Sequence, residues 1–121
     1  MEPKKEDRVK LALVPNWDMS TMRIIALSQL KKYQQQYPLA ERQLALWAGF
    51  VSKASWSTPQ DIKDSFRSAS FIENNRVVFN ICGNNYRLVV AVAYQIQAVY
   101  VKFFGTHAEY DNINAATIEV K

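Results

Sequence analysis

Residues 75–111 read NRVVFNICGNNYRLVVAVAYQIQAVYVKFFGTHAEYD, and this stretch decides the fold. It holds three runs rich in β-branched and aromatic residues, which predicts three consecutive strands followed by a loop. The Gly83-Asn84 pair is typical of a tight turn between the first two strands. With that turn, Asn80 lies opposite Arg87. We therefore expect a small antiparallel sheet.

The two faces of this sheet differ in chemistry. A slip of one residue would exchange the faces, so the hydrophobic pattern selects the register of the third strand. Placing Val99, Val101 and Phe103 beside Leu88 and Val90 gives a strongly apolar face, which we expect to be core. The opposite face then carries cations, small residues and two aromatic rings. Its expected members are Arg76, Val78, Asn80, Arg87, Val89, Ala91, Ala93, Tyr100, Lys102 and Phe104.

The cationic face has the chemistry of an RNA-binding surface. Cations neutralise phosphate, and aromatic rings stack unpaired bases. A solvated sheet face with scattered charge is the alternative, and the residue types alone favour it. The following loop adds the only histidine, His107, beside Glu109, Tyr110 and Asp111. Histidine titrates near neutral pH and is the commonest general acid or base, although a lone histidine is more often structural.

The residues upstream of the three strands carry helical patterns. Leu44, Trp47 and Val51 recur at helical spacing, which predicts a core-facing helix in which Trp47 packs rather than binds a ligand. Thr58, followed by a proline, is typical of a helix start. Residues 22–26 form a short apolar strand candidate. We expect an α+β fold in which N-terminal helices pack on one face of a small antiparallel sheet.

The length and composition of the chain limit the kinds of protein it can be. The chain has 121 residues and a formal net charge of +4, so it is one domain that permits an anionic partner. We expect residues 1–21 to be a flexible N-terminal extension, with Met22 as an alternative start, and residues 22–121 to be the domain. No apolar run approaches a membrane span and no signal peptide is evident, so we expect a cytoplasmic protein without a membrane partner. Cys82 and His107, the single cysteine and the single histidine, are too few for a zinc site, which usually takes several such side chains.

At these residues the chain resembles the HigB family of toxins from type II toxin–antitoxin systems, which have a RelE-like fold. The resemblance runs from Met22 to about Ile118 and is carried by MRII, NRVVFNI-x-GN-x-YRLVV and GTHAEYD. It implies a ribosome-dependent mRNA interferase that cuts translated mRNA in the ribosomal decoding site. It also implies neutralisation by a HigA-type helix-turn-helix antitoxin, which would supply DNA binding, so this chain would meet DNA only indirectly.

Cleavage by a ribose 2′-hydroxyl needs protons moved and phosphorane charge stabilised, and we expect neither a metal ion nor a cofactor. Arginine and lysine suit the phosphate; histidine and tyrosine suit proton transfer, nucleotide orientation or base stacking. The aspartate of the loop would orient one of them or only cap the local turn. The predicted catalytic residues are Arg87, His107, Tyr110 and Lys102, and the predicted RNA-binding residues are Arg76, Asn80, Tyr100 and Asp111.

A second class of function stays open. The chain could be a non-catalytic or degenerate module of the same fold that binds RNA, the ribosome or a protein. Such a module would have almost the same sequence, because a fold can persist after its catalytic activity is lost. A small-molecule enzyme is the weakest alternative, since the sequence has no phosphate-cradling glycine loop and no nucleophile motif.

Overall fold

The computed structural model describes residues 21–120. In chain order the elements are β1 (Arg23–Ile25), α2 (Leu27–Gln36), η2 (Pro38–Ala40), α3 (Glu41–Lys53), α4 (Pro59–Ser65), β2 (Ser70–Ile72), β3 (Arg76–Ile81), β4 (Tyr86–Ala93), η3 (Tyr94–Ile96), β5 (Ala98–Thr106) and α5 (His107–Tyr110). The predicted N-terminal extension lies outside the described residues except for Thr21, and it stays a prediction. None of the helices described here has the length and apolar character needed to cross a membrane.

The sheet has five strands in the order β1-β5-β4-β3-β2, and it is mixed. Strand β1 pairs in parallel with β5, and the other three pairings are antiparallel. The prediction of a purely antiparallel sheet is therefore wrong at this edge. The strand at residues 22–26 was expected, but its pairing was not. Parallel strands are not joined by a hairpin turn, so the sequence contains no local signal for this pairing. Strand β2 was not expected, because it is only three residues long.

The predicted hairpin of β3 and β4 is confirmed. Asn80 lies opposite Arg87, and the turn between the strands places Gly83 at φ +66°, where glycine has no Cβ to clash. The β4–β5 pairing departs from the prediction at a β-bulge. Val90 pairs with Val101, but Val89, the residue before it on β4, pairs with Phe103, so one residue of β5 is inserted.

The bulge exchanges two aromatic side chains between the faces of the sheet. Phe104 is 2% exposed and belongs to the core, whereas Phe103 lies on the other face, so the expectation for both residues is wrong. The physical reason is the inserted residue, because alternation resumes one position later beyond it. The sequence pattern Phe-Phe offers either ring to the core and does not reveal the bulge.

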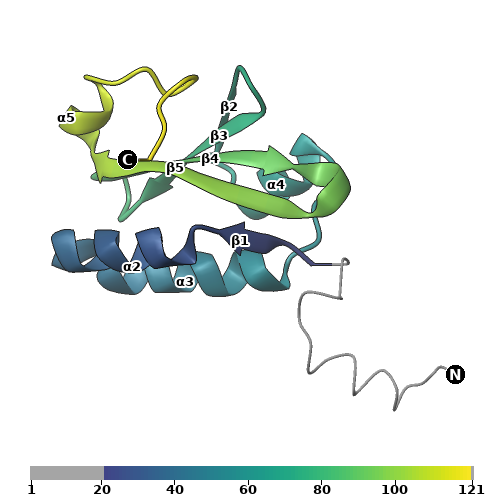
Figure 1. The fold of residues 1–121 in the computed structure, drawn as a ribbon, viewed down its shortest axis with the longest axis horizontal. Coiled ribbons are helices and arrows are strands. Elements are labelled where there is room, and N and C mark those ends of the chain that lie inside the picture. Colours follow the sequence, from purple (N-terminus) through teal and green to yellow (C-terminus); the bar gives the residue numbers. More distant parts are fainter. Residues whose placement is uncertain (1–20, 121) are drawn as a thin grey trace, which may run out of the picture.

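Aromatic rings fill the space between the apolar face and the first two long helices. Figure 1 shows α2 and α3 side by side beyond that face. From α3, the Trp47 ring meets the Phe79 ring edge-on at 5.4 Å, and from α2 the Tyr33 ring lies 5.6 Å from Phe104. Trp47 is 3% exposed, as expected of a packing residue. Truncating a buried ring such as Phe79 costs about 3–5 kcal/mol.

The C-terminal segment, residues 111–120, lies over the other face of the sheet (Figure 1). Arg76 and Asn74 donate side-chain hydrogen bonds to backbone carbonyls of this segment. Two residues of the predicted cationic face, Val78 and Val89, are buried. That face is therefore largely covered by the chain itself, which the sequence did not indicate.

Candidate active site

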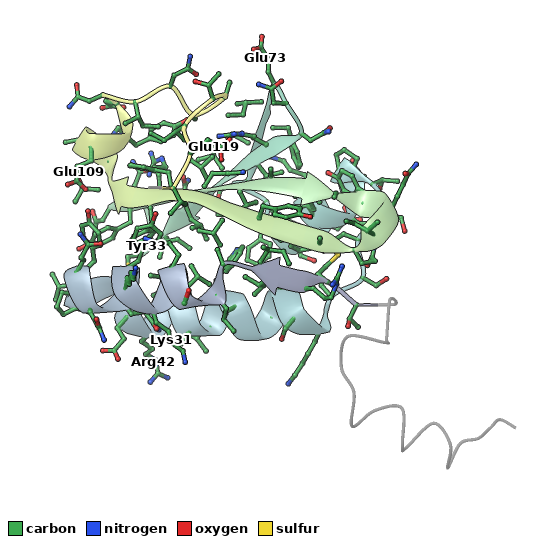
Figure 2. The ribbon with its side chains drawn as sticks, viewed as in Figure 1. Lys31, Tyr33, Arg42, Glu73, Glu109 and Glu119 are labelled. Atoms are coloured by element: carbon green, nitrogen blue, oxygen red, sulfur yellow. The ribbon has the colours of Figure 1, made fainter. Side chains whose placement is uncertain are left out.

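Two of the predicted cations meet a carboxylate from the C-terminal segment. Arg76 Nη2 lies 2.7 Å from Glu119 Oε2, and Lys102 Nζ lies 2.6 Å from Glu119 Oε1. We call these three residues the C-terminal clamp. Figure 2 places Glu119 over the face of the sheet away from α2 and α3. The hydrogen bond from Lys102, followed by the bond from Arg76, lowers the pKa of Glu119 from its ordinary value.

The clamp changes what its cations can do. The Arg76 side chain is only 6% exposed and its guanidinium also holds two backbone carbonyls, so any contact with RNA requires the C-terminal segment to move. Lys102 is more accessible, and its Nζ lies 5.8 Å from the centre of the Tyr100 ring. Asn80 is half-buried on β3. The RNA-binding roles of Arg76, Asn80 and Tyr100, and the catalytic role of Lys102, stay predictions.

Arg87 lies in a different setting at the start of β4. Its Nη2 donates to Asn84 Oδ1 at 2.9 Å, and its Nη1 donates to the carbonyls of Asn84 and Tyr86. Its guanidinium carbon lies 5.9 Å from the centre of the Tyr110 ring. These partners are neutral, and no ion pair of the described residues involves Arg87. The partners orient the cation and leave its charge to attract an anion.

The histidine lies on α5, the short helical turn that follows β5. Thr106 caps this turn by accepting a hydrogen bond from the backbone N–H of Glu109, whose carboxylate accepts one from the Thr106 N–H. The His107 N–H donates to the carbonyl of Asn85, which ties the turn to the β3–β4 loop. Nδ1 of His107 lies 3.3 Å from Asp111 Oδ2, and both side chains are solvent-exposed. The role predicted for Asp111, orienting a neighbouring side chain or only capping the turn, stays a prediction.

The register separates the two groups of predicted site residues. Arg76 pairs with Ala91, which lies four residues along β4 from Arg87, or about 13 Å at the rise of a strand. Gly105, just before the histidine turn, pairs with Arg87. The structure therefore gathers Arg87, His107, Tyr110 and Asp111 at one end of the sheet and places Arg76 away from them. Lys102 lies at the bulge between these positions, and its partner is Glu119 of the clamp.

Three supporting residues were missed. Asn84 was considered only as a turn residue, although it holds Arg87. Glu109 could have been found from its spacing, because Thr106-x-x-Glu109 matches a capping box. Glu119 gave no signal, since nothing in the sequence brings the C-terminal segment back onto β3. In the part of the chain that the structure describes, no three His, Cys, Asp or Glu side chains form a group that could hold a metal ion.

The family is shown by comparison with known proteins. Residues 40–113, more than half of the chain, match the family HigB_toxin, described as the RelE-like toxic component of a toxin–antitoxin system. The chain belongs to this family, and the resemblance inferred from the sequence is confirmed. The matched residues include Arg87, His107, Tyr110 and Asp111.

The curated relatives carry names that specify an activity. The protein named mRNA interferase toxin HigB from Escherichia coli K12 is 29% identical over 96 residues, covering 78% of this chain and 92% of that protein. The protein named mRNA interferase HigB from Shigella flexneri matches with the same identity and coverage. Another mRNA interferase HigB, from Escherichia coli O6:H1, is 24% identical over 94 residues, covering 76% of this chain and 91% of that protein.

Proposed function

We propose that this HigB-family toxin is a ribosome-dependent mRNA endoribonuclease that acts from the Arg87 end of the sheet. The observation that carries the proposal is Arg87 itself, a half-buried residue whose guanidinium is held by neutral partners beside the turn of His107 and Tyr110. The names of the curated relatives support the same reaction. Fixed guanidinium groups suit phosphate because they donate two parallel hydrogen bonds.

The reaction divides into three tasks. The ribose 2′-oxygen attacks the adjacent phosphorus and forms a new P–O bond, while the bond from phosphorus to the 5′-oxygen breaks. The 2′-hydroxyl loses a proton and the departing 5′-oxygen gains one, so the products are a cyclic phosphate and a free 5′-hydroxyl. Extra negative charge develops on the phosphorane oxygens between these states. One group must accept the proton, one must donate it, and one must stabilise the charge.

We assign charge stabilisation to Arg87. His107 and Tyr110 take the tasks of proton transfer and nucleotide orientation, and Asp111 orients the imidazole of His107. Lys102 is a second phosphate contact, available when Glu119 gives up its ion pair. Nothing in this scheme calls for a metal ion or a cofactor.

The remaining partners are proposed from the family. We propose that the mRNA is presented in the ribosomal decoding site, that a HigA-type helix-turn-helix antitoxin neutralises the toxin, and that the protein acts in the cytoplasm. Ribosome dependence is reasonable because positioning alone can supply many orders of magnitude of rate. We also infer a RelE-like arrangement in which α2 and α3 cover the apolar face, supported by the ring contacts of Trp47 and Tyr33.

The decisive test is primer extension on a translated mRNA in a purified translation system. Discrete cuts within codons are expected when ribosomes translate the message, and intact RNA is expected when they are omitted. Stalled but intact message would instead identify a non-catalytic ribosome-binding module and would remove the nuclease assignment. Equal cutting of naked RNA would remove ribosome dependence only.

A further inference from the structure

A side chain from the residue that follows α2 reaches the turn that carries the histidine. The hydroxyl of Tyr37 donates a hydrogen bond of 2.8 Å to Oε1 of Glu109, although the two residues are 72 positions apart. The same Oε1 accepts the backbone N–H of Thr106 at 2.8 Å. The carboxylate that caps α5 from within is therefore also bonded to a separate element. Figure 2 places Glu109 at the end of the sheet, below α5.

The Tyr37 hydroxyl is itself held in place. Its ring lies edge-on to the rings of Phe104 and Tyr86, with centroids 5.3 and 5.7 Å away. Its backbone N–H bonds to the carbonyl of Tyr33 at the end of α2. Burial, reinforced by the neighbouring Glu109 carboxylate, raises the pKa of Tyr37 to about 12, so the hydroxyl keeps its proton at neutral pH. The hydroxyl thus donates a charge-assisted hydrogen bond to the solvent-exposed Glu109 carboxylate.

Gly105 allows Glu109 to come this close. A Cβ built on Gly105 would lie 2.7 Å from Glu109 Oε1 and 2.8 Å from the ring of Phe103. Any other residue would push the carboxylate away from its two donors. The close packing of β5 against α5 is thus built into the backbone, and it brings Glu109 within reach of Tyr37.

The same tyrosine touches the support of Arg87. Its ring packs on Tyr86, and the backbone carbonyl of Tyr86 accepts a hydrogen bond from Arg87 Nη1 at 3.3 Å. Tyr37 therefore contacts the residue that precedes Arg87 on β4 and the residue that caps the His107 turn. The two parts of the proposed reaction centre lie on different elements, so a shared contact fixes their relative position.

We propose that Tyr37 and Glu109 form a strut that sets the position of the His107–Tyr110 turn relative to Arg87, which makes both of them positioning residues for cleavage. The inference rests on the proposed function and adds to it two residues that do not touch the substrate. A cap needs only Thr106 and Glu109. The bond to Tyr37 adds a fixed distance from α2, and small misplacements of reacting groups carry large costs in rate.

The test compares variants that change single bonds. Tyr37→Phe removes the hydroxyl and keeps the ring in its aromatic contacts. Tyr33→Phe is the matched control, since it removes a hydroxyl from the last turn of α2, just before Tyr37, and from the same aromatic cluster, without touching Glu109. Glu109→Gln keeps an oxygen that can accept both hydrogen bonds, whereas Glu109→Ala loses both. We would measure kcat and KM for cleavage of mRNA on programmed ribosomes, and hydrogen exchange of residues 106–112 in the free protein.

The strut predicts that Tyr37→Phe lowers kcat roughly tenfold with KM within about twofold, and speeds exchange in residues 106–112. Glu109→Ala should behave likewise, Glu109→Gln should recover most of the rate, and Tyr33→Phe should change neither readout. Unchanged kcat and exchange in Tyr37→Phe would overturn the strut, as would an equal loss in Tyr33→Phe. If the wild type cuts no message, the nuclease proposal fails instead, and the exchange comparison still decides whether the strut holds the turn.

Discussion

The Arg87 end of the sheet and the C-terminal clamp use the same kind of side chain in opposite ways. In the clamp, Arg76 and Lys102 share a carboxylate, Glu119, supplied by the chain itself. At the other end, Arg87 is held by an amide oxygen, two carbonyls and a tyrosine ring. The cations of the clamp are already paired with an anion. Arg87 is oriented by its neighbours, but no carboxylate among the described residues forms an ion pair with it.

The difference shows why a cluster of cations does not by itself define a binding site. A cation that already faces a carboxylate gains little from a second anion, because it must first give up the first. A cation that is oriented by neutral groups can bind an anion without first breaking an ion pair. The clamp is accordingly expected to govern stability and the position of the C-terminal segment, and Arg87 is expected to govern cleavage.

Arg87→Ala tests the comparison with the largest effect. Loss of one preorganised charge-stabilising group lowers kcat by about 10²–10³-fold, so induced expression should no longer arrest growth. The protein should remain folded, as checked by circular dichroism. Full toxicity from a stable Arg87→Ala protein would remove Arg87 from the reaction centre.

His107→Gln tests the second group at the same end. The amide can keep part of the packing but cannot exchange protons in the same way, so cleavage should fall by roughly 10²-fold. The rate of message cutting on programmed ribosomes, measured as a function of pH, checks this. Retained cleavage with a flat pH profile would mean that His107 only positions the nucleotide.

Arg76→Met tests the clamp, and here the expected loss is in stability. The variant removes hydrogen bonds to two carbonyls and to Glu119, which should lower the free energy of unfolding by about 2 kcal/mol. Urea unfolding measures this change. A loss of cleavage comparable to Arg87→Ala in a stable Arg76→Met protein would erase the distinction between the two regions.

Glu119→Gln gives the smallest expected effect and a defined pH dependence. The folded-state pKa of Glu119 is lowered, chiefly by Lys102, so its contribution to stability is present above the unfolded-state pKa and is lost as pH falls through the folded-state value. Glu119→Gln should therefore have a shallower loss of stability on acidification than the wild type, seen by unfolding between about pH 3 and 7.

The control for that titration is Asp61→Asn on α4. The Asp61 carboxylate also has a lowered pKa, through backbone hydrogen bonds from Ser57 and Thr58, but it lies far along the chain from the clamp. Both variants should lose less unfolding free energy than the wild type as the pH is lowered. Only Glu119→Gln should speed hydrogen exchange in residues 114–120. Equal exchange in both variants would show that Glu119 does not hold the segment.

Local patterns predicted the elements of the fold, and non-local contacts limited the prediction. The turn at Gly83 and the alternation in β3 and β4 fixed their register, since both signals lie within one hairpin. The bulge in β5 could not be predicted, because Phe103 and Phe104 satisfy the core equally well. The parallel pairing of β1 and the return of the C-terminal segment depend on contacts between distant residues.

The candidate site was predicted as a set of residues but not as an arrangement. Arg87, His107, Tyr110 and Asp111 were named from chemistry and resemblance, and they do lie together. Arg76 and Lys102 were named for the same reasons, yet they face Glu119. The path of the last residues decides which cations face Glu119, and a pattern of charges along strands contains no information on that path.

The most direct test places the two regions side by side in one assay. The single-turnover rate of cleavage on programmed ribosomes would be measured for the wild type, Arg87→Ala and Lys102→Ala. We predict that the rate falls by about 10²–10³-fold in Arg87→Ala. In Lys102→Ala it should fall by roughly tenfold or less, because the Lys102 ammonium of the wild type is already paired with Glu119. Equal losses, or a greater loss in Lys102→Ala, would contradict the assignment of the reaction centre to the Arg87 end.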